Sequence, residues 1–257
     1  MDSWNFKPAR DIELSPVARA RSLRRESGLV STAGHLTWQL STRAFFKLYH
    51  RLSVEADGLF PLQPPFVMIA NHTSHLDALL LASALPARLC DCVFPVAAGD
   101  VFFDTPTMSL FAATLLNALP MWRKNCGAHA LAELKKRLLE EPCGLILFPE
   151  GTRSRDGMLG PFKAGLGMLT AGTTVPVVPC HLSGAFEAFP PNARWPRPRK
   201  IRLKIGKPLV FDSVPSGRDG WNRIASEAQE AVRQLGGAPT AVGRSGDPPK
   251  GRVLSPG

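Results

Sequence analysis

Apolar runs recur along the middle of the chain and are separated by stretches with helical periodicity. An apolar run of about four to eight residues is typical of a strand that is buried on both faces, and such runs lie at 66–70, 93–97, 144–148 and 175–180. Helical patterns lie at 76–85, 106–117, 128–141 and 221–235. At 201–205 apolar residues alternate with Lys and Arg, which is the period of a half-exposed strand. Strands that alternate with helices predict an α/β fold with a largely parallel, mixed sheet flanked by helices.

A longer helical pattern of mixed character begins at Leu36. Every fourth residue is apolar, and basic side chains lie among them. The apolar stripe is Leu36, Leu40, Ala44, Leu48 and Leu52, and the basic residues are Arg43, Lys47, His50 and Arg51. One interpretation of 36–52 is an N-terminal amphipathic helix that packs this stripe on the domain core. The other is a helix that inserts the stripe into an anionic bilayer, with Arg and Lys at the headgroups. The sequence leaves both open.

The ends of the chain differ in composition from its centre. Residues 1–28 carry arginines among acidic residues and lack the apolar segment of a secretory signal, so we expect a flexible basic extension. The folded domain is expected to cover 29–235, and the tail at 236–257, rich in Gly, Pro and Ser, is expected to be disordered. No stretch reaches the ~18 uninterrupted apolar residues of a spanning helix, so the chain is not expected to cross a membrane.

Charge narrows the choice of partner. The chain of 257 residues has 31 Lys and Arg against 21 Asp and Glu, a formal net charge of +10. Such an excess favours nucleic acid, acidic lipid headgroups or a phosphorylated substrate. The basic stretch at 194–207 is either a solvated strand face or a contact with anionic lipid or an acidic carrier protein. Nucleic acid is not expected, because the chain has one Tyr and no run of stacking aromatics.

Cysteine usage indicates a reducing compartment. The five cysteines are scattered, odd in number and mostly in or beside apolar runs, which is typical of intracellular thiols. Cys90 and Cys92 lack the second pair that a zinc site needs. We therefore expect a cytoplasmic protein without a structural metal.

A histidine and an aspartate stand between the strand at 66–70 and the helix at 76–85. Open α/β sheets bind their ligands at this place, beyond the carboxyl ends of the strands. We predict His72 as a general base and Asp77 as the group that orients it. A structural alternative is a capping box, in which Ser74 caps the helix and Asp77 closes the motif. His72 and His75 alone are a weak metal signal, and no metal is expected.

A second polar cluster, residues 148–155, follows the strand at 144–148. Gly151 lets the backbone approach a ligand closely, Arg153 supplies a planar fork of donors that suits a phosphate, and Thr152 and Ser154 add hydroxyl groups. An ordinary polar loop is the alternative. Taken together, the two clusters suggest a base that works beside a phosphate.

Both clusters carry a resemblance to a known family. Asn-His-x-x-x-x-Asp at 71–77, followed by Phe-Pro-Glu-Gly-Thr-Arg-Ser at 148–154, resembles the glycerolipid acyltransferase family of the lysophosphatidate acyltransferase type. Val-Pro-Val-Val-Pro at 175–179 is similar to the family's fourth motif, and the resemblance extends over 50–210. It implies a glycerol-3-phosphate acyltransferase-like fold. It also implies acyl transfer from acyl-CoA or acyl carrier protein to a lyso-glycerophospholipid, most simply 1-acylglycerol-3-phosphate giving phosphatidate.

The resemblance also implies roles for individual residues. His72, held by Asp77, takes the proton from a glycerol hydroxyl, which attacks the thioester directly, and no metal or redox cofactor is needed. Glu150 matches the acid that shapes the phosphate loop. The substrate-binding residues implied by the resemblance are Asn71, Ser74, Arg123, Glu150, Gly151, Thr152 and Arg153. The implied location is peripheral, on an anionic membrane at the inner face of the cell membrane.

The family's second motif is altered in this chain. Its usual Lys aligns with Gly99, a later Gly aligns with Ser109, and the closing Asp-Arg becomes Trp122-Arg123. The missing Lys leaves open acyl transfer to another hydroxyl acceptor, such as a lyso-amino-lipid. A separate alternative is a non-catalytic module that has kept the fold and binds anionic lipid or nucleic acid, and the two complete motifs argue against it.

Overall fold

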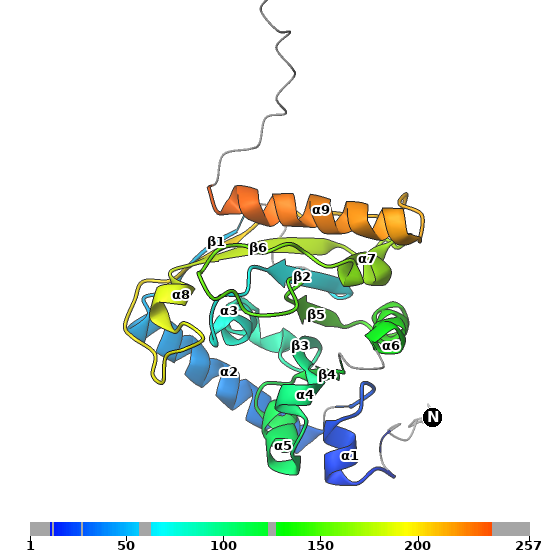
Figure 1. The fold of residues 1–257 in the computed structure, drawn as a ribbon. Coiled ribbons are helices and arrows are strands. Elements are labelled where there is room, and N and C mark those ends of the chain that lie inside the picture. The colour runs from blue at the N-terminus through cyan, green and yellow to red at the C-terminus, as the bar shows by residue number, and fades with distance from the viewer. Residues whose placement is uncertain (1–10, 12, 27, 57–62, 123–126, 238–257) are drawn as a thin grey trace, which may run out of the picture.

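The computed structural model describes residues 11, 13–26, 28–56, 63–122 and 127–237. The strands in these ranges are β1 (Ser53–Ala56), β2 (Phe66–Ala70), β3 (Val93–Ala98), β4 (Leu119–Met121), β5 (Gly144–Leu147), β6 (Val177–Ser183) and β7 (Arg202–Ile205). They form a sheet in the order β1-β7-β6-β2-β5-β3-β4 (Figure 1). The strands from β6 to β4 are parallel to one another, whereas β7 is antiparallel to β6 and β1 is parallel to β7. The predicted largely parallel, mixed sheet is confirmed.

Helices cover both faces of this sheet (Figure 1). One face carries α6 (Gly127–Glu140), α7 (Gly165–Thr170) and α9 (Arg218–Leu235), and the other carries α2 (Leu29–Tyr49), α3 (Asp77–Ala84) and α8 (Ala185–Ala188). The other described helices are α1 (Pro16–Ala20), α4 (Gly99–Phe102), α5 (Pro106–Thr114) and the 3₁₀ turn η1 (Ala87–Leu89). Helices predicted at 76–85, 106–117, 128–141 and 221–235 are found, each within one turn of its predicted bounds.

β2 lies inside the sheet, and all five of its residues are buried. Its side chains alternate between the faces: Val67 and Ile69 join the core under α6, α7 and α9, while Phe66 and Met68 join the core under α2 and α3. Burial on both faces explains the uninterrupted apolar run. Ile69 pairs in register with Leu147 of β5, so the segments that leave the carboxyl ends of these two strands meet at one edge of the sheet.

α2 packs on the domain through Phe46, which is fully buried, and through polar residues on the same face. Leu40 and Leu48 are 50% and 79% exposed, whereas Gln39 is buried. The Gln39 amide donates to the carbonyls of Ala82 and Leu85, at 3.1 Å each. Carbonyls at the end of a helix such as α3 lack partners within that helix, and the polar side of α2 satisfies them. The interpretation that the leucine stripe packs on the core is therefore wrong for Leu40 and Leu48.

Other differences from the predicted elements are local. α2 begins at Leu29 rather than Leu36 and ends at Tyr49. β1 was not predicted, because it is half-buried at Ser53 and exposed at its other three residues and so lacks an apolar pattern. The four-residue α8 is too short to show a periodicity. Most of the tail at 236–257 lies outside the described residues.

The described part of the N-terminal segment differs from the flexible extension expected for 1–28. It forms α1 and contacts α5, the residue before β4, and α6. Arg25 is buried and donates to the carbonyl of Ala118 and to Oδ1 of Asn117. Burial, followed by the charge of Arg137, lowers the pKa of Arg25 to about 10. Composition alone does not reveal such contacts, because an arginine fork binds carbonyls that lie far along the chain.

Candidate active site

His72 and Asp77 meet in the turn between β2 and α3. Nδ1 of His72 lies 2.9 Å from Oδ2 of Asp77. The same oxygen accepts hydrogen bonds from the backbone amides of Thr73 (2.7 Å) and Ser74 (2.8 Å), and the Asp77 side chain is fully buried. Because a carboxylate oxygen accepts, this contact favours the tautomer that carries the proton on Nδ1 and the lone pair on Nε2. This is the arrangement of an oriented general base.

The capping-box alternative is not formed as predicted. α3 begins at Asp77, and its N-cap position is Leu76, which makes no side-chain cap. The Ser74 hydroxyl instead donates to the carbonyl of Phe189 at 2.8 Å and accepts from the Leu76 amide at 3.2 Å. Asp77 still accepts the Ser74 amide. One carboxylate oxygen therefore both helps to start the helix and orients His72.

The loop that leaves β5 holds the histidine from the other side. The Phe148 ring stacks on the His72 imidazole with ring centroids 4.1 Å apart and 18° between the planes. Glu150 accepts from the His72 amide through Oε1 (2.8 Å) and from the Gly160 amide through Oε2 (3.0 Å). Burial raises the pKa of Glu150, and these two backbone hydrogen bonds oppose the rise. The Ser154 amide donates to the His72 carbonyl at 2.7 Å, so the two motifs are joined through both backbone groups of His72.

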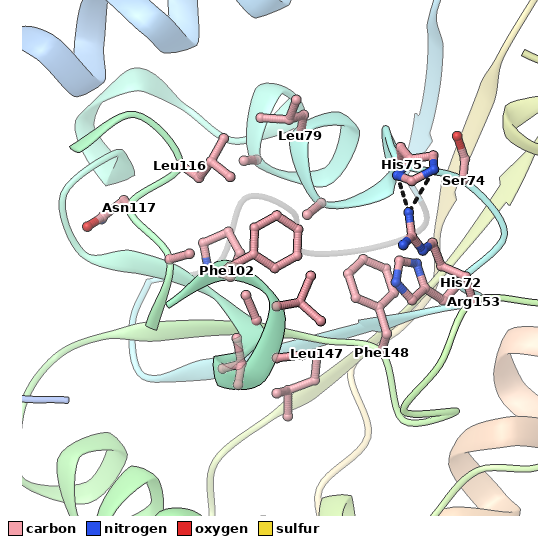
Figure 2. A pocket seen from close by; sticks show the side chains of 18 of the residues that line it. His72, Ser74, His75, Leu79, Phe102, Leu116, Asn117, Leu147, Phe148 and Arg153 are labelled. Atoms are coloured by element: carbon pink, nitrogen blue, oxygen red, sulfur yellow. Dashed lines mark hydrogen bonds between the residues drawn. The ribbon is translucent and has the colours of Figure 1, made fainter. Parts of the chain in front are cut away.

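A cavity of about 630 Å³ opens in front of His72. Its walls come mainly from α2, α3, β3 and α4, and most of the lining is apolar. Figure 2 shows His72 and Arg153 at one end and Asn117 at the other, with Leu79 and Phe102 between them. An apolar cavity that ends at a histidine held by a carboxylate suits an aliphatic chain whose polar end lies beside the histidine.

The end of the cavity near His72 is positively charged. Arg153, Arg155 and Lys163 line the cavity, and no Asp or Glu side chain of the described residues does. The Arg153 guanidinium contacts the His75 ring, as Figure 2 shows. Burial lowers the pKa of Arg153, against the opposing effect of the Asp77 charge. An anionic headgroup is the ligand that this rim favours.

Three other predicted site residues also line the cavity: Ser74, Gly151 and Thr152. Arg123 lies outside the described residues. Lys163 was not predicted. The only sequence signal for it is a basic residue inside the Gly-rich segment that follows the 148–155 loop.

Asn71 and Glu150 lie beside the cavity without lining it. The Asn71 side chain is 4% exposed and is engaged by β6, where it donates to the Leu182 carbonyl (3.0 Å) and accepts from the Leu182 amide (2.8 Å). Glu150 is engaged by two backbone amides. The geometry of both side chains fits a positioning role rather than contact with a substrate.

Among the residues that the structure describes, His72 and His75 have no third partner that would complete a metal site. Within the described ranges, no group of three or more His, Cys, Asp or Glu side chains is placed to hold a metal ion. The His75 ring contacts Arg153, and its Nε2 lies 3.2 Å from the carbonyl of Pro191. His75 is thus held at the cavity rim by protein groups.

Comparisons with known proteins show which family and which relatives this chain is similar to. A model of the family described as "Acyltransferase" matches residues 51–183, a span that contains both motifs. The 1-acyl-sn-glycerol-3-phosphate acyltransferase alpha of Mus musculus is 29% identical over 183 residues, and that of Homo sapiens is 33% identical over 182 residues. Each match covers 67% of this chain and 62% of the relative. The chain thus spans less than two thirds of the length of these relatives.

The fold is similar to that of a solved structure. The crystal structure of the 1-acyl-sn-glycerophosphate (LPA) acyltransferase PlsC from Thermotoga maritima matches with a TM-score of 0.58 at 24% sequence identity. The match covers 77% of this chain and 78% of that chain. The mixed sheet with helices on both faces is therefore an arrangement that a solved protein also adopts.

Proposed function

This chain belongs to the acyltransferase family, and from this premise we propose that it is an O-acyltransferase of phospholipid biosynthesis. The donor is acyl-CoA or acyl carrier protein. The acceptor is a lyso-glycerophospholipid, 1-acylglycerol-3-phosphate in the simplest case, and the product is then phosphatidate. One observation carries the proposal: a base oriented by a carboxylate, His72 on Asp77, lies where an apolar cavity meets a cationic rim.

His72 moves the proton in the proposed reaction. Nε2 accepts the proton of the acceptor hydroxyl while the hydroxyl oxygen attacks the thioester carbonyl. The new C–O bond gives a tetrahedral oxyanion, and its collapse breaks the C–S bond. The proton then passes from His72 to the leaving thiolate, which restores the imidazole. The scheme uses neither an acyl-enzyme nor a metal or redox cofactor.

The surroundings of His72 support its role as the base. The buried Asp77 carboxylate stabilises the imidazolium that forms when Nε2 takes the proton. Stacking on Phe148 and the hydrogen bond from the His72 amide to Glu150 restrict the ring and its backbone. A base that is already in place avoids the entropic cost of being ordered in the transition state.

The loop after β5 supports a phosphate-bearing acceptor. Gly151, Thr152 and Arg153 line the cavity together, and the planar guanidinium of Arg153 matches the geometry of phosphate oxygens. Among the described residues, the backbone amides of Thr152 and Arg153 donate to no protein group. They are therefore available to an anion.

We also propose that the protein works peripherally on the anionic inner face of the cell membrane. Leu40 and Leu48 of α2 face outward, and Trp195, in the basic stretch that precedes β7, is 79% exposed. The Tyr49 hydroxyl donates to the Pro196 carbonyl at 3.1 Å, so this stretch lies beside the C-terminal end of α2. Apolar side chains next to Trp and Arg suit a headgroup region. No described helix combines the length and the apolar character needed to cross a membrane.

The test is acyl transfer by the full chain on defined vesicles. Vesicles of phosphatidylglycerol carry one lysolipid each time: 1-acylglycerol-3-phosphate, its choline ester, or a lyso-amino-lipid. Acyl-CoA and acyl carrier protein are supplied in parallel, and both thiol release and acylated lipid are measured. We expect phosphatidate to form fastest, and His72→Ala to lower kcat by about 10²–10⁴-fold, the usual effect of a positioned base.

Three results would contradict the proposal in different ways. Preferred acylation of the lyso-amino-lipid would identify a different acceptor class. Thiol release without acylated lipid would indicate thioester hydrolysis. Vesicle binding without thiol release from any donor would indicate a non-catalytic lipid-binding module.

A further inference from the structure

The end of β3 supplies no cation to the cavity. Gly99 follows this strand as the first residue of α4, and a Cβ built on it would lie 2.7 Å from Cδ2 of Trp122. The indole ring therefore lies against the α-carbon of Gly99, and a side chain at this position does not fit unless Trp122 moves. Gly99 and Trp122 were two separate departures in the sequence. In space they are in contact and form one altered feature.

A cation reaches the rim from another segment. Lys163 lies in the stretch between the 148–155 loop and α7, and its side chain crosses the α-carbon of Gly151. A Cβ on Gly151 would lie 2.6 Å from the Lys163 Nζ, 3.2 Å from its Cε and 3.3 Å from its Cδ. Gly151 also has φ of +75°, a left-handed conformation that favours glycine. The ammonium is thus brought to the loop that carries Arg153.

Two backbone tethers hold Lys163 in this place. Its own amide donates to the Pro149 carbonyl at 2.9 Å. Three residues earlier, the Gly160 amide donates to Oε2 of Glu150 at 3.0 Å. Because Glu150 also binds the His72 amide, the base and the segment that carries Lys163 are fixed to one buried carboxylate.

The ammonium of Lys163 has no protein partner in the described part of the chain. Among the described residues it has neither an ion pair nor a hydrogen bond, and it lines the cavity together with Gly151, Thr152 and Arg153. The cavity has no acidic lining residue in the described ranges that would neutralise it. An exposed ammonium at the rim of the cavity is suited to an anionic ligand.

We propose that Lys163 is a second cation for the phosphate of the acceptor and acts together with Arg153. This inference rests on the proposed function. A phosphate monoester carries a charge of about −1.5 to −2 at neutral pH, more than one guanidinium neutralises. Arg153 offers a planar fork and Lys163 a point charge, and the two residues approach the same loop from different segments. Lys163 thereby supplies a positive charge in a site where Gly99 stands in place of the family's usual Lys.

The test removes the charge and keeps the aliphatic stem. In Lys163→Met we expect the KM for 1-acylglycerol-3-phosphate to rise by about 10- to 100-fold, the usual effect of a hydrogen bond to a charged group. The KM for the acyl thioester should change less than about twofold. Lys163→Arg should recover most of the loss. Lys136→Met, an exposed lysine on α6, is the matched control and should behave as wild type.

An acceptor without phosphate separates a phosphate contact from a general defect. With 1-acylglycerol presented in the same vesicles, Lys163→Met should act like wild type. An equal loss on both acceptors, or an equal rise in the KM of donor and acceptor, would overturn the assignment.

A binding measurement keeps the inference distinct from the proposed function. In a His72→Ala background, the Kd for 1-acylglycerol-3-phosphate should rise by a similar factor when Lys163→Met is added. If this rise is found while the wild type transfers no acyl group, the proposed acyl transfer is wrong and the proposed phosphate site is supported. If the Kd is unchanged, the phosphate site fails whatever the activity.

Discussion

Oε1 of Glu150 accepts a hydrogen bond from the backbone amide of His72 at 2.8 Å. The carboxylate that follows β5 therefore fixes the backbone of the histidine that follows β2. The other oxygen of Glu150 binds the Gly160 amide, and a Cβ on Gly160 would lie only 2.9 Å from it. A single buried side chain thus sets the spacing between the proposed base and the loop of Arg153.

Glu150→Gln is expected to weaken both the fold and the reaction. An amide has one acceptor oxygen, so one of the two backbone amides would face an NH₂ group. A buried unpaired donor costs about 1–3 kcal/mol, and we expect the free energy of unfolding to fall by about this amount, with a lower kcat. Urea unfolding and thiol-release kinetics measure the two effects. Glu187→Gln, at an exposed position of α8, is the control, and equal losses in both variants would contradict the argument.

Asp77→Asn separates the charge of the carboxylate from its geometry. Three donors, from His72, Thr73 and Ser74, converge on Oδ2, and the carbonyl oxygen of Asn can take this position. The negative charge beside the imidazolium is lost, so we expect kcat to fall by about 10²–10⁴-fold with little change in the acceptor KM. Steady-state kinetics with both substrates varied measure this. A kcat close to that of the wild type would mean that orientation alone suffices.

The parts of the fold that the sequence predicted depend on local signals. β2 and β5 are buried on both faces, so each appears as an uninterrupted apolar run. His72 and Asp77 lie close in the sequence, and parallel neighbouring strands bring the turns after β2 and β5 to the same edge of the sheet. The sequence therefore placed both motifs at the carboxyl ends of strands, and the structure adds that β2 and β5 are neighbours in the sheet.

What the sequence did not predict depends on contacts between distant segments. Leu48 faces outward because α2 turns Phe46 into the core and Gln39 toward the carbonyls at the end of α3. The burial of Arg25 follows from acceptors near β4, Asn117 and Ala118. Lys163 reaches the site only because Gly151 has no side chain. None of these contacts leaves a periodic pattern, because each joins segments that are not adjacent along the chain.

The pH dependence of stability is expected to reflect His50. This side chain is fully buried at the end of α2, and neither ring nitrogen has a hydrogen-bond partner among the described residues. Burial lowers the pKa of His50 below its ordinary 6.5, against a smaller opposing effect of the Arg199 backbone. As the pH falls below 6.5, the unfolded chain binds the proton first. The free energy of unfolding therefore falls, by at most about 1.4 kcal/mol per pH unit, until the native-state pKa is reached.

His50→Phe tests this effect without opening a cavity. The ring packs edge-on against Phe45 and Tyr49, with centroids 5.2 and 4.9 Å apart, and a phenyl ring fits such surroundings. Urea unfolding at about pH 7.5 and about pH 5.5 gives the stability lost on acidification. We expect the variant to lose less stability on acidification. Part of the loss should remain, because burial also lowers the pKa of His181. An unchanged loss would exclude His50 as its source.

Leu48→Glu is expected to weaken membrane binding while leaving the fold intact. The side chain is 79% exposed, so its replacement removes little core packing, whereas a bilayer would bury it. Burying a leucine is worth about 1.5–3 kcal/mol, and the added carboxylate is repelled by anionic lipid. Binding to phosphatidylglycerol vesicles, measured by co-sedimentation, should therefore fall by about tenfold or more. Leu139→Glu is the matched control, because Leu139 is 56% exposed on α6, at the opposite face of the sheet. Equal losses in the two variants would mean that α2 is not the membrane-facing element.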